Sequence, residues 1–314
     1  MTKPTAISLF TGCGGSDRGV IDAGFDVLMA NDVLRYAKEV YLANLPETDY
    51  RCENIEGIKT FPDSDILIGC YPCQGFSQGG SRRSGNKINY LYRQFDRALR
   101  KIKPKAFIVE NVSGMKRNDF AHLLRAQVVR FRSAGYRVKT QILNAADYGV
   151  PQERMRLFIV GIRSDFDVEY HFPKPTHGPD GQKEYASIRN ALEGMPLWPD
   201  KTEYCQDPFH WYYLSRNRRR DWDSPSKTIV SHQRHVPLHP VSPRLQRIHT
   251  DKWVWTDDAP ARRFSFREAA ALQGFGRNLE FPDSYGIGMK YRVVGNAVPP
   301  QLFRAVAKAL PEIF

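Results

Sequence analysis

The stretch TAISLFTGCGGSDRG, residues 5–19, decides the fold class of this chain. Its apolar start, TAISLF, is typical of a buried β-strand, and three glycines follow at positions 12, 14 and 15. The next segment, DRGVIDAGF, has helical character. Glycines at such a place let the backbone turn sharply and approach a ligand, and the helix behind them offers N–H groups to an anion. The stretch predicts a strand, a turn and a helix with a ligand at the turn, although a plain tight turn also explains the glycines.

The same rhythm of strand and helix continues through the first half of the chain. Apolar runs alternate with helical segments, which is typical of a mostly parallel sheet with helices on both faces. Two later runs flank the turn-rich segment ADYGVPQER and predict an antiparallel hairpin. The expected fold class is α/β, a doubly wound sheet with an antiparallel edge hairpin plus a small irregular lobe. The expected later strands are DVLMAND, SDILIGC, KAFIVEN, YRVKTQILNA and MRLFIVGIR.

The rhythm stops after residue 164. Much of the stretch 165–284 is rich in Pro, His, Trp and Arg, with short elements and long loops, so we expect a small lobe and a hinge there. The last segment, PPQLFRAVAKAL, has proline in its first turn and apolar residues at helical spacing, so it should pack on the core. Residues 1–164 and 285–314 are expected to form one discontinuous domain.

The composition limits the setting and the partners of the protein. The net charge is +12, and residues 51–150 carry 18 Lys and Arg against 8 Asp and Glu. A basic surface suits a polyanion such as nucleic acid, although solvated helix faces explain charge runs equally well. No apolar run approaches the roughly 18 residues of a membrane span. The N-terminus does not resemble a signal peptide, and five cysteines without regular spacing indicate reduced thiols in the cytoplasm.

The glycine cluster lacks the features of the common phosphate-binding motifs. A dinucleotide-binding G-x-G-x-x-G would need glycine where the chain has Asp17, and the Lys-Ser/Thr pair of a phosphate loop is absent from this glycine stretch. The second expected strand ends at Asn31 and Asp32, and an acidic residue there can accept hydrogen bonds from ribose hydroxyls. Together these features indicate a nucleoside cofactor without a pyrophosphate.

The stretch GCYPCQGFSQGG, residues 69–80, brings Cys73 to the carboxyl edge of the expected sheet. Open α/β folds bind their ligands at this edge. Three interpretations are open for Cys73: a buried core thiol, half of a redox pair with Cys70, or a nucleophile. Redox C-x-x-C pairs usually begin a helix, and the chain has no second cysteine pair for zinc.

Two further segments place polar side chains at the same edge. In FIVENVSG, Glu110 follows a short apolar strand; a carboxyl in apolar surroundings can hold a proton to donate, and a solvated acid is the alternative. In YGVPQERMRLFIVG, Gln152, Arg154 and Arg156 alternate at strand spacing. We expect these three on one face, either to bind a base oxygen or phosphates, or as a structural ladder of ion pairs.

Six short segments stand in an order that is found in one enzyme family. They are FTGCGG, PCQ, ENV, QERMR, SPSKTI and GNAVPP. With them the chain resembles the cytosine-C5 DNA methyltransferases over most of its length, in the order of the unpermuted bacterial and phage members. The resemblance implies the fold of S-adenosylmethionine-dependent methyltransferases, with target recognition in the expected lobe, between QERMR and SPSKTI.

The resemblance also implies a covalent mechanism. Cys73 would attack C6 of a cytosine that is flipped out of duplex DNA, so that C5 becomes a nucleophile. Glu110 would hydrogen-bond N3 and supply a proton there, while Arg156 would contact O2 and orient Glu110, with Arg154 as support. The methyl group of S-adenosylmethionine would pass to C5 and leave S-adenosylhomocysteine. No metal is expected.

The remaining site residues follow from the same resemblance. The loop 75–90 would close over the flipped nucleotide, with mobile glycines and phosphate-pairing arginines. Val33 stands where many members have an aromatic residue against adenine, and Asn54 stands where they have aspartate. The expected cofactor-binding residues are Phe10, Gly12, Gly14, Gly15, Asp32, Val33, Asn54, Ile55, Leu91 and Asn296. The expected DNA-binding residues are Pro72, Gln74, Ser77, Arg82, Arg83, Gln152, Arg216, Arg218, Thr228 and Arg234.

A sequence-specific DNA methyltransferase is therefore the expected activity. Its expected partners are duplex DNA and, where there is one, a cognate restriction endonuclease that acts as a separate chain. A cytosine-C5 methyltransferase acting on RNA is the alternative, because a small lobe and a basic surface do not distinguish DNA from RNA. A binding protein without catalysis and a thiol–disulfide enzyme using Cys70 and Cys73 are less favoured. We expect a monomer in the cytoplasm, associated with the nucleoid through DNA.

Overall fold

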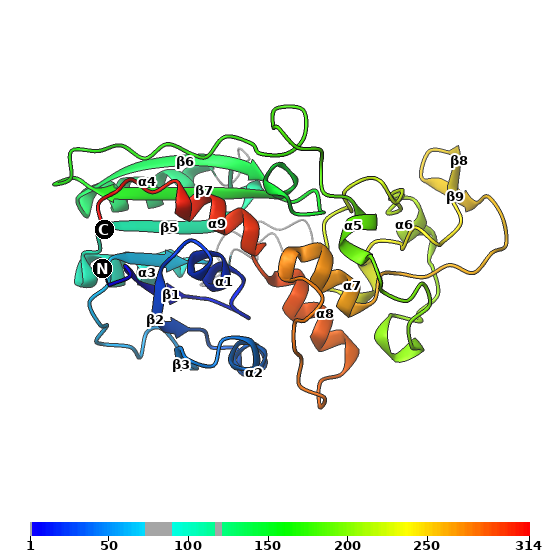
Figure 1. Cartoon of the computed structure of the whole chain (residues 1–314), viewed down its shortest axis with the longest axis horizontal. Helices are drawn as coiled ribbons and strands as arrows, with labels where there is room; N and C mark the ends of the chain where they lie inside the picture. Colours follow the sequence, from blue (N-terminus) through cyan, green and yellow to red (C-terminus); the bar gives the residue numbers. More distant parts are fainter. Residues whose placement is uncertain (1, 73–89, 117–120) are drawn as a thin grey trace. The chain divides into compact units, whose positions relative to one another are not determined.

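The computed structural model describes residues 2–72, 90–116 and 121–314 (Figure 1). The chain forms two compact units. Unit 1 comprises residues 1–144, 155–174 and 302–314, and unit 2 comprises residues 145–154 and 175–301.

Within the described residues, unit 1 is built on a seven-stranded sheet in the order β3-β2-β1-β4-β5-β7-β6. Neighbouring strands from β3 to β5 run parallel, and β7 lies antiparallel between β5 and β6. This confirms the expected mostly parallel sheet with an antiparallel hairpin at one edge. The strands are β1 (Thr5–Leu9), β2 (Asp26–Asn31), β3 (Asp49–Arg51), β4 (Ile66–Gly69), β5 (Ala106–Val112), β6 (Tyr136–Asn144) and β7 (Met155–Arg163).

Helices cover both faces of this sheet, with α3 and α4 on one side and α1 and α9 on the other (Figure 1). The rings of Phe95 in α3 and Phe131 in α4 lie 5.8 and 5.0 Å from that of Phe107 in β5. On the opposite face, Phe303 of α9 meets Phe158 of β7 at 6.0 Å. The helices of unit 1 are α1 (Gly15–Ile21), α2 (Arg35–Asn44), α3 (Tyr92–Ile102), α4 (Ala121–Ser133) and α9 (Pro300–Lys308). The first two residues of α9 belong to unit 2.

The end of β4 positions the chain that leads to Cys73. β4 is buried along its whole length, which explains the unbroken apolar run ILIG. At Gly69, its last residue, a Cβ atom would lie 2.5 Å from the ring of Phe95, so glycine is needed where α3 packs on the strand. The chain then leaves the sheet through Tyr71 and Pro72, and Cys73 itself lies outside the described residues.

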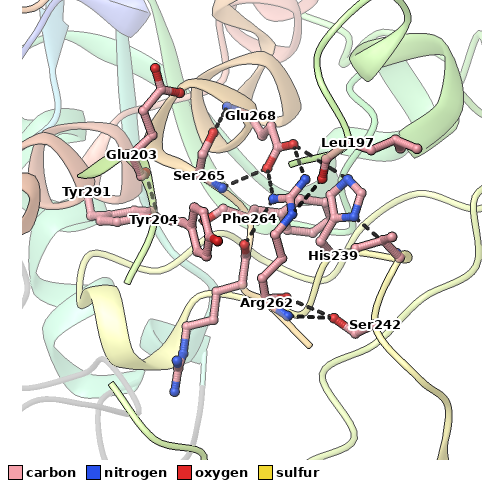
Figure 2. A network of polar contacts seen from close by, with 12 residues as sticks. Leu197, Glu203, Tyr204, His239, Ser242, Arg262, Phe264, Ser265, Glu268 and Tyr291 are labelled. Carbon is pink, nitrogen blue, oxygen red and sulfur yellow. Dashed lines mark hydrogen bonds and ion pairs between the residues drawn. The ribbon is translucent and has the colours of Figure 1, made fainter. Parts of the chain in front are cut away.

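Unit 2 consists of short elements joined by long loops, and part of its core is polar. Arg262 and Glu268 form a fully buried pair, and Nη1 and Nη2 of the arginine donate to the two carboxylate oxygens at 2.7 and 2.8 Å (Figure 2). The backbone N–H of Ser265 also donates to this carboxylate, at 2.7 Å, in a capping box that begins α7. The elements are α5 (Ile188–Leu192), α6 (Trp211–Leu214), β8 (Leu245–His249), β9 (Lys252–Trp255), α7 (Phe266–Ala270) and α8 (Ile287–Asn296).

The division into units differs from the expected boundaries. Residues 145–154 and 285–301 belong to unit 2, whereas the sequence suggested that they join the catalytic domain, and residues 165–174 belong to unit 1. The contacts of Arg154, described below, give the physical reason, because its guanidinium binds backbone carbonyls inside unit 2. Of the helices that the structure describes, none combines the length and the apolar composition needed to cross a membrane.

Candidate catalytic and cofactor site

Glu110 and Arg156 form a largely buried ion pair at the carboxyl end of β5. In the antiparallel ladder Glu110 pairs with Phe158 and Val112 pairs with Arg156, so the two charged side chains lie diagonally opposite on one face of the sheet. Nε of Arg156 lies 2.7 Å from Oε1 of Glu110, and the side chains are 15% and 9% exposed. The structure thus brings together two residues that the sequence placed at this edge.

Burial and mutual attraction act on this pair in opposite directions. Burial lowers the pKa of Arg156 from its ordinary value, and the Glu110 carboxylate opposes that shift. Arg156 in turn stabilises the negative charge of Glu110. The pair can therefore present a carboxyl group and a guanidinium side by side. This arrangement suits a ring in which a nitrogen that takes up a proton lies next to an oxygen that accepts hydrogen bonds.

The residue after Glu110 anchors the chain that leads to Cys73. Asn111 is buried, and its Nδ2 atom donates to the carbonyl of Tyr71 at 3.2 Å. The Tyr71 hydroxyl donates to Oε1 of Gln127 at 2.6 Å. These bonds fix the backbone two residues before Cys73. Nothing local in the sequence indicates this role of Asn111, since only the neighbouring acid carries a chemical signal.

Cys70 has the properties of an unreactive thiol. The residue is partly exposed, but burial of the thiol raises its pKa well above the ordinary value, and the negative charge of Glu110 raises it further. A neutral thiol is a poor nucleophile and a poor partner in disulfide exchange. This environment disfavours a redox pair between Cys70 and Cys73.

A buried carboxylate, Asp17, holds the glycine turn in place. Four hydroxyl groups donate to its two oxygens over distances of 2.5 to 2.9 Å. Because the donors come from β1, the turn, α1 and α2, one carboxylate ties together the elements around the turn. Burial raises the pKa of Asp17, and the four hydrogen bonds oppose that shift. The donors are Ser8, Thr11, Ser16 and Tyr41.

The backbone of the turn is unusual at two positions. Gly14 has a φ angle of 87°, and a Cβ atom there would lie 2.8 Å from the ring of Tyr41, so only glycine fits. Phe10 has a φ angle of 61°, which is uncommon for a residue with a side chain, and its ring meets that of Tyr71 edge to face at 6.0 Å. Strained backbone of this kind collects at ligand sites.

Asp32 stands just after β2 and faces this turn. Its Oδ2 atom accepts a hydrogen bond from the Gly12 N–H at 2.9 Å, and Oδ1 accepts one from the Leu34 N–H at 3.0 Å. Burial raises the pKa of Asp32, and these backbone donors oppose the shift. Each oxygen keeps a further lone pair, which suits two ribose hydroxyls. The adjacent Val33 is 62% exposed and offers an apolar surface to a base.

Comparison with known proteins decides to which family this arrangement belongs. The family model described as C-5 cytosine-specific DNA methylase matches residues 5–312. The chain belongs to this family. The Type II methyltransferases M.BspRI of Lysinibacillus sphaericus and M.BsuRI of Bacillus subtilis are 34% and 35% identical to it, over 99% and 98% of this methylase and 82% and 79% of those proteins. The expected enzyme class, a DNA (cytosine-5)-methyltransferase, is confirmed, and DNA is favoured over the RNA alternative.

Solved structures support the fold of the methylase. DNMT2 of Spodoptera frugiperda, solved as a mutant, matches with a TM-score of 0.71 at 16% identity, over 98% of this chain and 99% of that one. The S. pombe Dnmt2 methyltransferase matches with a TM-score of 0.70 at 19% identity, over 97% of each chain. At these identities the likeness shows the fold alone, and it agrees with the expected methyltransferase fold.

The other expected cofactor residues of unit 1 lie in a turn or at the start of a helix. Oδ1 of Asn54 accepts a hydrogen bond from the Glu56 N–H at 3.0 Å and closes a turn, and Ile55 is buried. Gly15 begins α1, and Leu91 is the residue before α3. Their contacts with a cofactor stay predictions. Within the described ranges, no group of three or more His, Cys, Asp or Glu side chains could hold a metal ion.

Two residues expected beside Arg156 are buried inside unit 2. Arg154 donates to three backbone carbonyls of the SPSKTI and GNAVPP segments at 2.8, 2.9 and 3.1 Å. The amide of Gln152 donates to the side chain of Gln273 at 2.7 Å and accepts from the Ile229 N–H at 2.8 Å. Because β7 begins only at Met155, these residues belong to the turn before the strand. Their predicted roles at the substrate stay untested.

The remaining residues expected to bind DNA lie partly in unit 2 and partly in segments that the structure does not describe. Thr228 donates to the carbonyl of Glu153 at 2.7 Å, and Arg234 forms an ion pair with Asp207 at 2.6 Å. Asn296, the expected cofactor residue of unit 2, is exposed at the end of α8. Pro72 is half-buried. The residues outside the description are Cys73, Gln74, Ser77, Arg82 and Arg83.

Proposed function

We propose that this methylase transfers a methyl group from S-adenosylmethionine to C5 of a flipped-out cytosine in a specific duplex DNA sequence, through a covalent bond between Cys73 and C6. The observation that carries the proposal is the contact of 2.7 Å between Glu110 and Arg156. β4 and β5 are parallel neighbours with Gly69 opposite Val109, so the chain toward Cys73 leaves the sheet beside this pair.

Each group of the site then has one task. The thiolate of Cys73 bonds to C6, and the electrons of the 5,6 double bond become available at C5. Glu110 in its protonated form gives a proton to N3, and Arg156 donates hydrogen bonds to O2, so charge on the ring is stabilised as it forms. S-adenosylmethionine supplies an electrophilic methyl group when it is bound. After C5 has taken this group, water removes the C5 proton, the electrons of that C–H bond re-form the 5,6 double bond and expel Cys73 as a thiolate, and Glu110 recovers its proton from N3.

Residues of unit 1 fit the nucleoside part of the cofactor. The Asp32 carboxylate would accept hydrogen bonds from the ribose, and Val33 and Ile55 would contact adenine, with Asn54 as acceptor for its amino group. Phe10, Gly12, Gly14, Gly15 and Leu91, together with Asn296 of unit 2, complete the proposed set. The product that leaves this site is S-adenosylhomocysteine.

The wider setting follows from duplex DNA as the substrate. We assign catalysis and cofactor binding to unit 1, and target recognition with the hinge to unit 2. Because the relatives are named Type II methyltransferases, methylation would protect DNA from a separate cognate restriction endonuclease. The active form proposed is a monomer, located at the nucleoid in the cytoplasm.

Methyl transfer from labelled S-adenosylmethionine tests the proposal. Purified wild-type protein is expected to label unmethylated duplex DNA and to leave RNA of the same sequence unlabelled. Cys73→Ser should abolish the labelling, and Cys70→Ala, which removes the buried thiol, should not. Labelling of RNA alone, or normal labelling by Cys73→Ser, would refute the proposal.

A further inference from the structure

Unit 2 carries an exposed cluster of aromatic and cationic side chains, called here the α6 platform. It consists of Trp211, Tyr212 and Arg216. Trp211 is 71% exposed and Tyr212 is 46% exposed, and their rings meet edge to face at 5.8 Å. The Arg216 guanidinium lies 4.9 Å from the Tyr212 ring centroid and donates to its hydroxyl at 3.2 Å. Large aromatic side chains gathered at one place on a surface mark a binding site.

The arginines after the platform differ from Arg216 in their partners. Arg219 and Arg220 form ion pairs of 2.6 Å with acidic residues of unit 2. Arg218 is partly buried and donates to a backbone carbonyl at 3.2 Å. Among the ion pairs of the described residues, none involves Arg216. Of the run RNRRR, Arg216 is therefore the residue whose charge is best placed to meet a ligand.

Arg263 supports the platform from inside unit 2. Its side chain is buried, and it donates to the carbonyl of Asp207 at 2.7 Å and to that of Arg234 at 3.1 Å. Its guanidinium also lies 4.3 Å from the ring centroid of Phe209 and 4.7 Å from that of Tyr213. Tyr213 is the buried residue of α6 itself. One buried cation thus holds α6 and the segment that leads into it.

The residue before Arg263 is anchored as well. Figure 2 shows the Arg262 guanidinium against Glu268 and the carbonyl of Leu197, to which its Nε atom donates at 2.9 Å. A buried guanidinium that forms two parallel bonds with a carboxylate has a fixed orientation. These contacts fix the backbone next to Arg263, and a surface that is ordered before binding loses less entropy when it binds.

The β8–β9 hairpin carries basic residues and packs against the core of α6. Trp255 of β9 packs on Phe209 with ring centroids 5.4 Å apart, so α6 and the hairpin share one small core. Arg247 and Lys252 lie on this hairpin and are exposed. An aromatic surface beside basic groups matches the chemistry of DNA, whose phosphates are anionic and whose guanine edges are the usual partners of arginine.

We propose that the α6 platform contacts the target sequence in duplex DNA and sets the sequence preference of the methylase, with Arg263 as its positioning residue. The inference rests on the proposed function, because it assigns the recognition of the same substrate. It is narrower than the family resemblance, since it selects Trp211, Tyr212 and Arg216 and leaves Arg219 and Arg220 as structural residues.

The test compares the binding of two duplexes by the full-length protein. One carries the sequence that is found methylated in a host expressing the protein, and the other has one base pair of that sequence exchanged. Trp211→Ala and Arg216→Ala should each weaken binding of the first duplex by about ten- to a hundredfold and bring the two affinities together. Arg189→Ala is the matched control, because Arg189 is exposed and paired with Asp223 at 2.7 Å; it should keep the ratio of the two affinities.

Arg263→Met tests the positioning role. This variant should raise KM for the target duplex and lower discrimination as Trp211→Ala does, while kcat at saturating DNA and the affinity for S-adenosylhomocysteine stay at wild-type values. Arg263→Lys, which keeps the charge, should restore part of the discrimination. A merely structural role would change stability without this split between KM and kcat.

Two results would overturn the inference. Wild-type discrimination in both Trp211→Ala and Arg216→Ala would remove the platform from recognition, and an equal loss for both duplexes would reduce it to a contact without sequence preference. A wild-type protein that transfers no methyl group to DNA would instead refute the proposed function. The two failures are therefore distinguishable.

Discussion

The Nε atom of Arg156 lies 2.7 Å from Oε1 of Glu110, with both side chains largely buried on one face of the sheet. The two residues reach this point from neighbouring antiparallel strands, β7 and β5. A change in either residue therefore alters the charge balance that the other one experiences. In the proposed mechanism both residues act on the cytosine ring and neither binds the cofactor. Mutation of the pair should therefore slow catalysis without changing cofactor binding.

Glu110→Gln should slow methyl transfer by about 10²- to 10⁴-fold, because the amide cannot give a proton to N3. The affinity for S-adenosylhomocysteine, measured by calorimetry, should not change. Asp165→Asn is the matched control, since Asp165 is exposed and pairs at 2.8 Å with Arg163, the last residue of the neighbouring strand β7. Normal turnover of Glu110→Gln would remove this residue from the reaction.

Asp17→Asn should weaken the binding of S-adenosylhomocysteine by about tenfold, roughly the value of one hydrogen bond. The amide NH₂ group would face hydroxyls that now donate to the carboxylate, so some of them must reverse and the turn must shift. Asp22→Asn, an exposed change just after the same helix, should bind normally. Calorimetric titration measures both variants, and wild-type affinity of Asp17→Asn would contradict the assigned role.

His239→Gln should make the protein less sensitive to acid. Nδ1 of His239 accepts a hydrogen bond from the Val241 N–H, and burial together with the charges of Arg262 and Arg219 lowers its pKa to about 2, although Nε2 lies 3.5 Å from Glu268. A depressed pKa means that the unfolded chain takes up the proton first, so stability is lost as the pH falls below about 6.5.

The expected loss from this one histidine is about 2 kcal/mol at pH 5 relative to neutral pH. Urea unfolding of the wild type and of His239→Gln at the two pH values measures it, because the variant lacks this contribution. Equal acid sensitivity of the two proteins would show that His239 is protonated in the folded state.

The sheet and the position of Glu110 could be predicted because both depend on local patterns. Apolar runs mark the buried parallel strands, and polar residues just after them mark the edge of the sheet where ligands bind. The diagonal contact between Glu110 and Arg156 could not be derived from the residues alone. It depends on the pairing of β5 with β7, and strand pairing between distant segments leaves no local signal.

The buried polar residues of unit 2 could not be predicted from the sequence, for a different reason. Arginines are ordinarily exposed, so nothing local shows that Arg262 and Arg263 are both buried. Arg154 and Gln152 alternate with Arg156 as a strand would, yet they lie in a turn whose partners are far along the chain. Asp17 attracted notice only as a break in a nucleotide-binding pattern, because its role needs four hydroxyl groups from separate elements.

Formation of a covalent adduct with duplex DNA that contains 5-fluorocytosine at the target position tests the central claim most directly. Fluorine at C5 cannot leave as a proton does, so the bond between Cys73 and C6 should persist after methyl transfer. We expect the wild type and Cys70→Ala to form an adduct that survives a denaturing gel and maps to Cys73, and Cys73→Ser to form none. Methylation of ordinary DNA without any adduct on fluorinated DNA, or an adduct at another residue, would contradict the account.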